Sequence, residues 1–281
     1  MKKTWMLGAA IALGLSLTSC SQDPLNENPT QKQEGRLLLT LKTDANFGQK
    51  ANVAQSRAVN EEDYKVIDNY TVEVTVGNEI VYKSKVSDLP TTHPYITMPI
   101  GAFKAKVYYG EEHAYSRDQF YVVGENEGYI ATDNTQEIKI TCTPTCGRIA
   151  VNFGQDAQTG KGMDEFYSDY YVTFAGTEAM GENTISWLKD DTEPWYVKLN
   201  EHEETINYTI TAFTKDTYMN GEKSNKTTAE GSFTLARNKA HKLNINPVYT
   251  PSTEGKFEIT IEIDDTTVEK NDTTDVPVDL V

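Results

Sequence analysis

Cysteine and histidine are scarce in this chain of 281 residues, which has 3 Cys and 4 His. The histidines are scattered and form no His-x-x-x-His pair, so metal binding and histidine-based acid–base catalysis find little support. The sequence also lacks a Gly-x-Ser-x-Gly elbow and a glycine loop that would hold a phosphate. We therefore predict no enzyme activity, no cofactor and no metal site.

Basic residues are also in short supply, with 26 Lys and Arg against 42 Asp and Glu and a net charge of -16. A chain this acidic is repelled by nucleic acid and by anionic lipid head groups, and no basic arm or basic helix offsets the repulsion. Nucleic acid is therefore excluded as a partner, and any link to a membrane must come from another source.

The chain has no apolar run long enough to span a bilayer, which needs about 18 residues. A short apolar stretch from Trp5 to Leu17 instead follows Lys2-Lys3 and ends in Leu-Thr-Ser-Cys20. A plain signal peptide would carry an Ala-x-Ala-like site. The pattern resembles a bacterial lipobox, which predicts a lipoprotein signal peptide over residues 1–19 and a lipid on Cys20.

A lipid on Cys20 would anchor the mature chain, whose net charge would be -18 with 24 basic and 42 acidic residues. Ser21 does not resemble an inner-membrane retention signal, so we expect the outer membrane, with exposure at the cell surface. Residues 20–34 are polar and contain two prolines, which is typical of a flexible tether.

From Gly35 onward, apolar and polar residues alternate with the period of two that is typical of half-buried strands. The pattern is plain in 36–42, 70–76 and 103–109, and turn residues separate such segments at short intervals. Several short strands so spaced predict an all-β sandwich.

An internal repeat organises these strands. The segment 35–39, which opens with Gly-Arg, returns at 147–151, and two further pairs follow in the same order, namely 102–107 with 206–213 and 131–140 with 235–245. A repeat unit this long is a whole domain, since solenoid repeats span about 20–50 residues. We predict two β-sandwich domains, at 35–145 and 146–281, the second with extra C-terminal strands.

Cys142 and Cys146 lie at the joint between these domains, in Thr-Cys-Thr-Pro-Thr-Cys-Gly. Outside the cytosol a disulfide is permitted, and the three-residue spacer can turn tightly enough to form one. The alternative is two free thiols with a packing role.

The C-terminal region leaves two readings open. Phe257 to Ile263 alternates cleanly, and Val276, Val278 and Leu280 alternate again. These strands either complete the second sheet as a hairpin or add to the open sheet edge of another subunit.

Trp187, Trp195 and Tyr196 flank a polar loop with carboxylates and a proline. Exposed rings beside carboxylates could stack on a sugar, which would make these residues a glycan platform. The alternative is that they anchor strand ends in the second core.

The order of these features resembles an uncharacterised family of fimbrillin-like Bacteroidetes surface lipoproteins. The features are the lipobox, the strand Gly-Arg-Leu-Leu-Leu-Thr-Leu, the loop with Ser56-Arg57-Ala58-Val59, the segment Pro99 to Ala105 and the second Gly-Arg. The resemblance implies tandem transthyretin-like, Greek-key sandwiches. It also implies a structural or adhesion role as a fimbrial accessory or anchor-like subunit, with other fimbrial subunits as partners. The alternative function is a glycan-binding outer-membrane lipoprotein.

Relatives of this kind are in some cases trimmed after an arginine, which exposes a groove for a partner's strand. Arg57-Ala58 is the position where the resemblance implies such a cut, and Arg36 is a second candidate. The other reading of both is an ordinary surface arginine. Asp265-Thr266-Thr267 and Asp272-Thr273-Thr274 resemble the O-glycosylation motif of this bacterial group, with Thr266 and Thr273 as acceptors.

Overall fold

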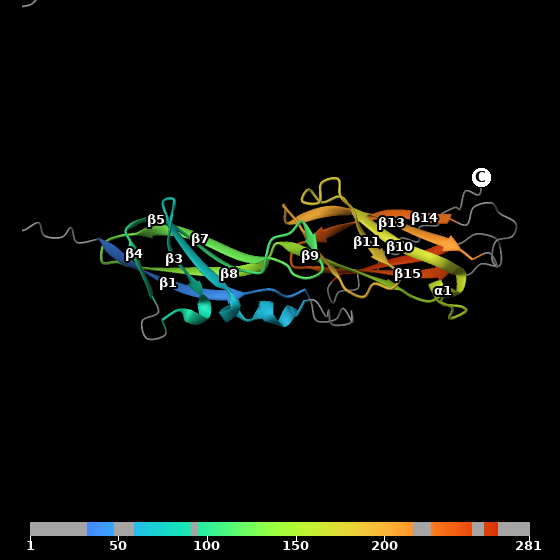
Figure 1. The fold of residues 1–281 in the computed structure, drawn as a ribbon, viewed down its shortest axis with the longest axis horizontal. Coiled ribbons are helices and arrows are strands. Elements are labelled where there is room, and N and C mark those ends of the chain that lie inside the picture. The colour runs from blue at the N-terminus through green and yellow to red at the C-terminus, as the bar shows by residue number, and fades with distance from the viewer. Residues whose placement is uncertain (1–32, 48–58, 91–94, 216–225, 249–255, 264–281) are drawn as a thin grey trace, which may run out of the picture. The chain divides into compact units, whose positions relative to one another are not determined.

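The computed structural model describes residues 33–47, 59–90, 95–215 and 226–248, together with the backbone of 256–263 (Figure 1). Almost all regular structure in these ranges is β-strand, and the helical elements are short. They are the 3₁₀ helices η1 (Glu61–Lys65), η2 (Ile67–Asn69) and η3 (Val86–Asp88) and the α-helix α1 (Met163–Phe166). The all-β, sandwich-like fold predicted from alternation is confirmed.

We call residues 33–145 the first lobe. Its strands β3-β2-β5-β7-β8-β1-β4 form one sheet in that order. Their bounds are β1 (Glu34–Thr43), β2 (Thr71–Val76), β3 (Glu79–Lys85), β4 (Tyr95–Pro99), β5 (Gly101–Tyr109), β7 (Val122–Ile130) and β8 (Thr135–Pro144). β7 and β8 pair only at Val122–Pro144 and Val123–Thr143. The two parts of the sheet share one core, to which β2 and β5 contribute from one side and β1, β4 and β8 from the other.

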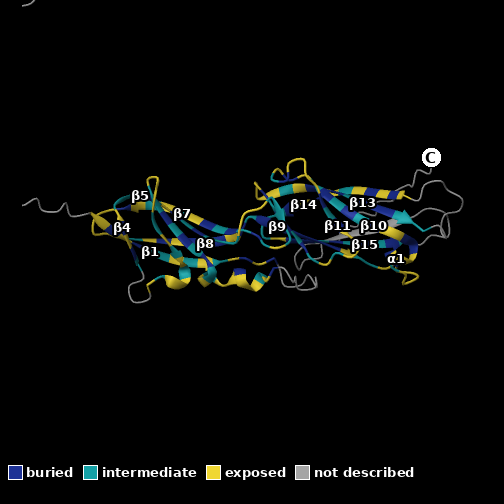
Figure 2. Ribbon diagram, in the orientation of Figure 1, coloured by how far each residue is buried: buried dark blue, intermediate teal, exposed yellow. Residues whose placement is uncertain are grey.

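We call residues 146–263 the second lobe. One of its sheets has the order β11-β10-β13-β14 and the other the order β16-β15-β9-β12-β6. The bounds are β9 (Cys146–Phe153), β10 (Tyr167–Ala175), β11 (Ile185–Leu188), β12 (Trp195–Lys198), β13 (Glu203–Thr214), β14 (Lys226–Ala236), β15 (Ala240–Val248) and β16 (Lys256–Ile263). Along β10, β11 and β14 buried residues alternate with more exposed ones, whereas β9 is buried from Cys146 to Val151 (Figure 2). A second core lies between the sheets.

The two lobes repeat one strand arrangement. The order β3-β2-β5-β7 corresponds to β11-β10-β13-β14, and β8-β1-β4 corresponds to β15-β9-β12. In the first lobe β1 is parallel to β8 and antiparallel to the short strand β4. In the second lobe β9 is likewise parallel to β15 and antiparallel to the short strand β12. The three repeated sequence segments fall on β1 and β9, on β5 and β13, and on the turns into β8 and β15. The division into domains at 145/146 stays a prediction.

The repeated glycine has the same structural reason in both lobes. An ideal Cβ on Gly35 would lie 2.2 Å from Ile130 Cγ2, at the end of β7. A Cβ on Gly147 would lie 2.5 Å from Leu235 Cγ, near the end of β14. The first strand of each lobe therefore passes so close to the following hairpin that only glycine fits.

Two strands depart from the repeat. β16 pairs with β15 over eight register positions, from Val248–Lys256 to His241–Ile263, so this segment forms the hairpin that completes the second sheet. β6 (Tyr115–Ser116) comes from the β5–β7 connection of the first lobe and pairs with β12 of the second. Val276, Val278 and Leu280 lie outside the described residues.

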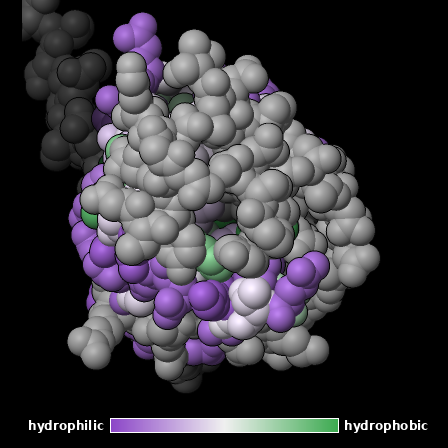
Figure 3. All heavy atoms as spheres, turned by 90° about the vertical axis from the view of Figure 1, so that its right-hand side faces the viewer, coloured by the Kyte–Doolittle hydropathy of each residue, from purple (hydrophilic) through white to green (hydrophobic). Residues whose placement is uncertain are grey.

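The described surface is mostly hydrophilic where Figure 3 views it, with isolated hydrophobic residues among purple ones. Within the part of the chain that is described, no helix has the length and apolar character needed to cross a membrane.

Candidate functional site

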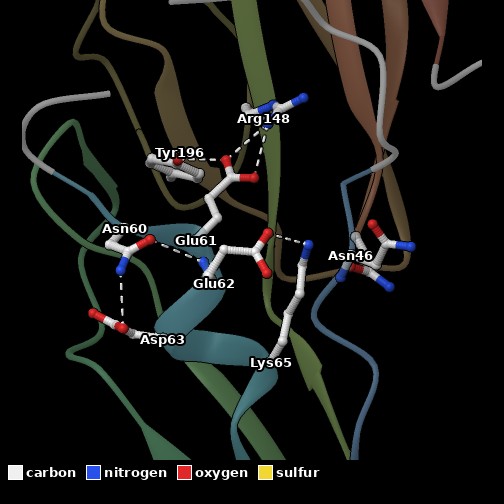
Figure 4. Close-up of polar contacts among 9 residues, drawn as sticks. Asn46, Asn60, Glu61, Glu62, Asp63, Lys65, Arg148 and Tyr196 are labelled. Carbon is white, nitrogen blue, oxygen red and sulfur yellow. Dashed lines mark hydrogen bonds and ion pairs between the residues drawn. The ribbon is translucent and has the colours of Figure 1, made fainter. Parts of the chain in front are cut away.

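The two lobes meet around a largely buried ion pair, in which the arginine is buried and the glutamate is partly exposed (Figure 4). Arg148 Nη1, on β9, donates to both carboxylate oxygens of Glu61, on η1, at 2.7 and 2.9 Å. The Tyr196 hydroxyl, on β12, donates to Glu61 Oε1 at 2.6 Å. One carboxylate from the first lobe thus binds two strands of the second.

Local sequence explains why Glu61 is in place. Asn60 precedes η1 as its N-cap and accepts a hydrogen bond from the Glu62 N–H at 3.3 Å, while its amide donates to Asp63 at 2.9 Å. The first turn of the helix contains three acidic residues, whose negative charges are stabilised by the positive end of the backbone dipole. Tyr64 is buried beneath the helix and fixes it to the first core.

The ion pair lies where water has little access. Arg148 is 7% exposed, and its guanidinium lies 5.6 Å from the ring centre of Phe47. Burial raises the pKa of the Tyr196 hydroxyl above its usual range, and the charge of Glu61 raises it further. Low access to water strengthens the attraction between Glu61 and Arg148. It also means that removal of one of the two charges would leave the other poorly solvated and would destabilise the protein.

Aromatic rings from both lobes pack beside the ion pair, and all of them belong to the first core. Phe120 stacks on Tyr64 at 3.7 Å between centroids and on Tyr196 at 4.7 Å. Phe47 meets Phe120 edge-on at 5.2 Å and Tyr196 at 5.6 Å. These contacts add to the burial of the rings, since aromatic pairs in such geometries stabilise by about 0.5–1.5 kcal/mol each.

Asn238, in the turn between β14 and β15, forms a second contact between the lobes. Its backbone is in the left-handed region (φ 57), which Asn tolerates. Its side-chain oxygen accepts from the Asn46 N–H at 3.0 Å, and its amide donates to the Asp44 carbonyl at 2.7 Å. We call Phe47, Glu61, Phe120, Arg148, Tyr196 and Asn238 together the junction.

The loop that carries β6 forms a third contact. Arg117 Nη2 donates to Asp191 Oδ2 at 2.6 Å and to the Ser186 carbonyl at 3.1 Å. Its guanidinium lies 4.4 Å from the ring centre of Trp195. Lys198 Nζ pairs with Glu112 at 3.0 Å. The first lobe therefore contributes both a strand and charged side chains to the second.

The predicted glycan platform is not formed as an exposed surface. Trp187 is 1% exposed and belongs to the second core, and Tyr196 is 2% exposed at the junction. Trp195 is partly buried, and its indole N–H donates to the Ser186 carbonyl at 3.1 Å beneath Arg117. A sugar ring cannot stack on rings that the protein itself covers, which agrees with the alternative reading of these residues as core anchors.

Cys142 and Cys146 are free, buried thiols on β8 and β9. Both side chains belong to the first core, and no bridge joins them. Burial raises the pKa of Cys142 to about 12 and also raises the pKa of Cys146. The two cysteines therefore fill space where the lobes meet.

These pKa values predict inert thiols in the folded protein, because the thiolate is the reactive form. In a chain that starts at Ser21, we expect a thiol reagent at pH 8 to leave both cysteines unmodified in the native state. In denaturant without a reductant, both should react. A thiol count in denaturant that stays at zero would mean that the cysteines are bridged.

Several predicted sites lie outside the described residues, namely Cys20, Arg57, Ala58, Thr266 and Thr273. Arg36 is described and lies within β1, where its N–H donates to the Asn134 carbonyl at 2.8 Å. Its guanidinium lies 4.7 Å from the Tyr95 ring centre. Cleavage after Arg36 would therefore require β1 to leave the sheet.

No group of three or more His, Cys, Asp or Glu side chains that could hold a metal ion occurs among the described residues. The junction itself offers an ion pair, hydrogen bonds and ring contacts, which bind segments of protein to one another.

The fold and the junction define an all-β, sandwich-like protein with two lobes bound by a largely buried ion pair. The chain belongs to the family described as "Domain of unknown function (DUF4493)", whose model matches residues 33–278. No curated protein resembles the sequence closely enough to count as a match.

Among solved structures, the chain is similar to a fimbrial assembly protein of Parabacteroides distasonis, at 11% identity and a TM-score of 0.38, over 82% of this chain and 98% of that one. It is similar to a candidate adhesin of Bacteroides ovatus, at 11% identity and a TM-score of 0.47, over 82% and 95%. It is also similar to candidate polysaccharide-binding proteins of Bacteroides thetaiotaomicron, at 12% identity and a TM-score of 0.40, over 84% and 99%. At these identities and TM-scores, no function is transferred from them.

Proposed function

We propose that this protein is a non-catalytic structural or adhesion subunit at the cell surface, anchored in the outer membrane by a lipid on Cys20. It acts as a fimbrial accessory or anchor-like component, and its two lobes are tandem transthyretin-like sandwiches. Its mechanism is β-strand addition, in which a strand of a partner subunit pairs with the backbone of the first lobe.

The position of β1 carries this proposal. β1 lies inside the sheet, parallel to β8 from Arg36–Thr135 to Thr43–Cys142 and antiparallel to β4 from Glu34–Pro99 to Leu38–Tyr95. The backbone edges of both neighbours are thus paired by the first described strand of the chain. Leaving these edges unpaired in the core would be costly, so loss of β1 favours a replacement strand.

The linkage of β1 to the rest of the chain supports trimming at Arg57-Ala58. β1 precedes this dipeptide in sequence, while every other strand that the structure describes follows it. One cut after Arg57 would therefore separate β1 from the remaining strands. Leu37 on β1 is fully buried, so a replacement strand needs apolar side chains at alternate positions. The alternating Val276, Val278 and Leu280 of another copy fit that pattern.

Assembly after trimming tests this function. A chain that starts at Ser21 is cut with an arginine-specific protease under native conditions, and its molar mass is measured by light scattering after size exclusion. We expect the cut chain to form oligomers and the uncut chain to stay monomeric. The variant Arg57→Ala should resist the cut and stay monomeric, and Arg36→Ala should behave like the parent chain.

A cut chain that releases the peptide ending at Arg57 and remains monomeric would contradict strand addition. Oligomers that also form from the uncut chain would show that assembly does not need the removal of β1.

A further inference from the structure

The continuation of β1 reaches from its own sheet into the second lobe. The Asp44 N–H still bonds to the Cys142 carbonyl at 2.8 Å, as an extension of the pairing between β1 and β8. The Asp44 carbonyl and the Asn46 N–H then bond to Asn238 in the second lobe. Phe47, which is 2% exposed, follows at once and lies over Arg148.

The residues that receive this segment are themselves tied to the first strand of the second lobe. The Asn238 N–H donates to the Cys146 carbonyl at 2.9 Å, and the Arg148 N–H donates to the Lys239 carbonyl at 2.9 Å. A change in the conformation of the β14–β15 turn therefore affects the hydrogen bonds at the start of β9. The residue equivalent to Asn238 in the first lobe is Asp133, which also has a positive φ and lies at the opposite end of β8 from the junction.

We propose that the junction couples the seating of β1 in the first lobe to the attachment of the second lobe. When β1 is in place, Phe47 covers the Arg148 guanidinium and Asn238 is hydrogen-bonded to Asp44 and Asn46. When β1 leaves, that cover and those two hydrogen bonds leave with it, whereas Glu61 stays on η1. The presence or absence of β1 in the first lobe thus changes how firmly the second lobe is attached. The role of this coupling in assembly rests on the proposed function.

The ion pair is suited to such coupling because its hydrogen bonding is incomplete. Arg148 Nε and Nη2 are buried and have no hydrogen-bond partner among the described residues, so within these ranges the guanidinium depends on Glu61 and on its contact with Phe47. A partly satisfied buried network is sensitive to the loss of a neighbour, because water then competes for the same charges. Uncovering this pair would weaken its hold on both lobes.

Hydrogen exchange of the uncut chain that starts at Ser21 tests the coupling. The variant Asn238→Gly keeps a residue that accepts positive φ and removes only the side chain that bonds to residues 44 and 46. We expect amide exchange in β1, which belongs to the other lobe, to become about tenfold faster, as loss of two hydrogen bonds implies. The matched variant Asp133→Gly makes the same change in backbone freedom at a turn that also contacts β1, because the Asp133 N–H donates to the Glu34 carbonyl at 3.1 Å. It therefore measures the effect of backbone freedom alone, which should speed β1 exchange by no more than about two- to fivefold.

Coupling is reciprocal, so a change on the β1 side must reach the second lobe. We expect Phe47→Leu to speed exchange in β12, which carries Tyr196, more than in β13. Equal effects of Asn238→Gly and Asp133→Gly on β1, or equal acceleration in every strand, would overturn the proposal. Because the chain is uncut, this result is independent of whether trimmed subunits assemble.

Discussion

Replacement of Arg148 by methionine is expected to lower the free energy of unfolding by about 3 kcal/mol. The substitution keeps much of the apolar volume but leaves the Glu61 carboxylate without its cation. Breaking one partner of a buried ion pair costs about 3–5 kcal/mol, and the partial exposure of Glu61, whose side chain is 25% exposed, places this case at the lower end. Chemical denaturation followed by tryptophan emission measures the change, since Trp187 and Trp195 both belong to the second lobe.

Two variants make the Arg148 experiment decisive. Arg36→Met changes the repeat-equivalent arginine, which is exposed beside Tyr95, and should cost less than about 1 kcal/mol. The pair Glu61→Gln with Arg148→Met should cost less than the sum of the two single changes, because both remove the same interaction. Additive costs would show that Glu61 and Arg148 do not stabilise the protein as a pair.

Replacement of Gly147 by alanine is expected to destabilise the protein by about 2–3 kcal/mol. The added methyl group would lie 2.5 Å from Leu235 Cγ and 2.8 Å from the Ala236 carbonyl oxygen, so β9 or the end of β14 must shift. Overpacking of this kind costs about 1–3 kcal/mol. Gly35→Ala should have a similar effect in the first lobe, because its methyl group would meet Ile130 and the Ala131 carbonyl oxygen.

Gly162→Ala provides the control, since its Cβ would have no neighbour closer than 3.8 Å and its φ of -80 suits alanine. We expect this change to cost less than about 1 kcal/mol. Thermal or denaturant unfolding of the three variants measures the effects. A Gly147→Ala variant as stable as Gly162→Ala would mean that the repeated glycine is not required by close packing.

Alternation in the sequence was enough to predict several strands, because one face of such a strand is buried and the other is exposed to water. β1, β2 and β5 were predicted this way, and the repeated segments fall on equivalent strands of the two lobes. β6 could not be predicted, since a strand of two residues shows no period and exists only because β12 offers a free edge.

The junction was not predicted because its residue types have ordinary explanations in isolation. In the sequence Glu61 is one of 42 acidic residues, and Arg148 fits the pattern of an ordinary strand residue. One signal was available in the repeated Gly-Arg, but the two arginines have different environments, exposed at Arg36 and buried at Arg148. The difference arises from Glu61 and Phe47, which are remote in sequence from Arg148, and no local pattern encodes such a contact.

Hydrogen exchange in β4 and β8 of the trimmed protein tests strand addition most directly. If β1 is the exchangeable strand, amides of Tyr95–Pro99 and Thr135–Pro144 should lose protection when the peptide ending at Arg57 is removed. They should regain it in the oligomers. Protection in β4 and β8 that stays unchanged after removal of β1, or that does not return on assembly, would contradict β-strand addition at this site.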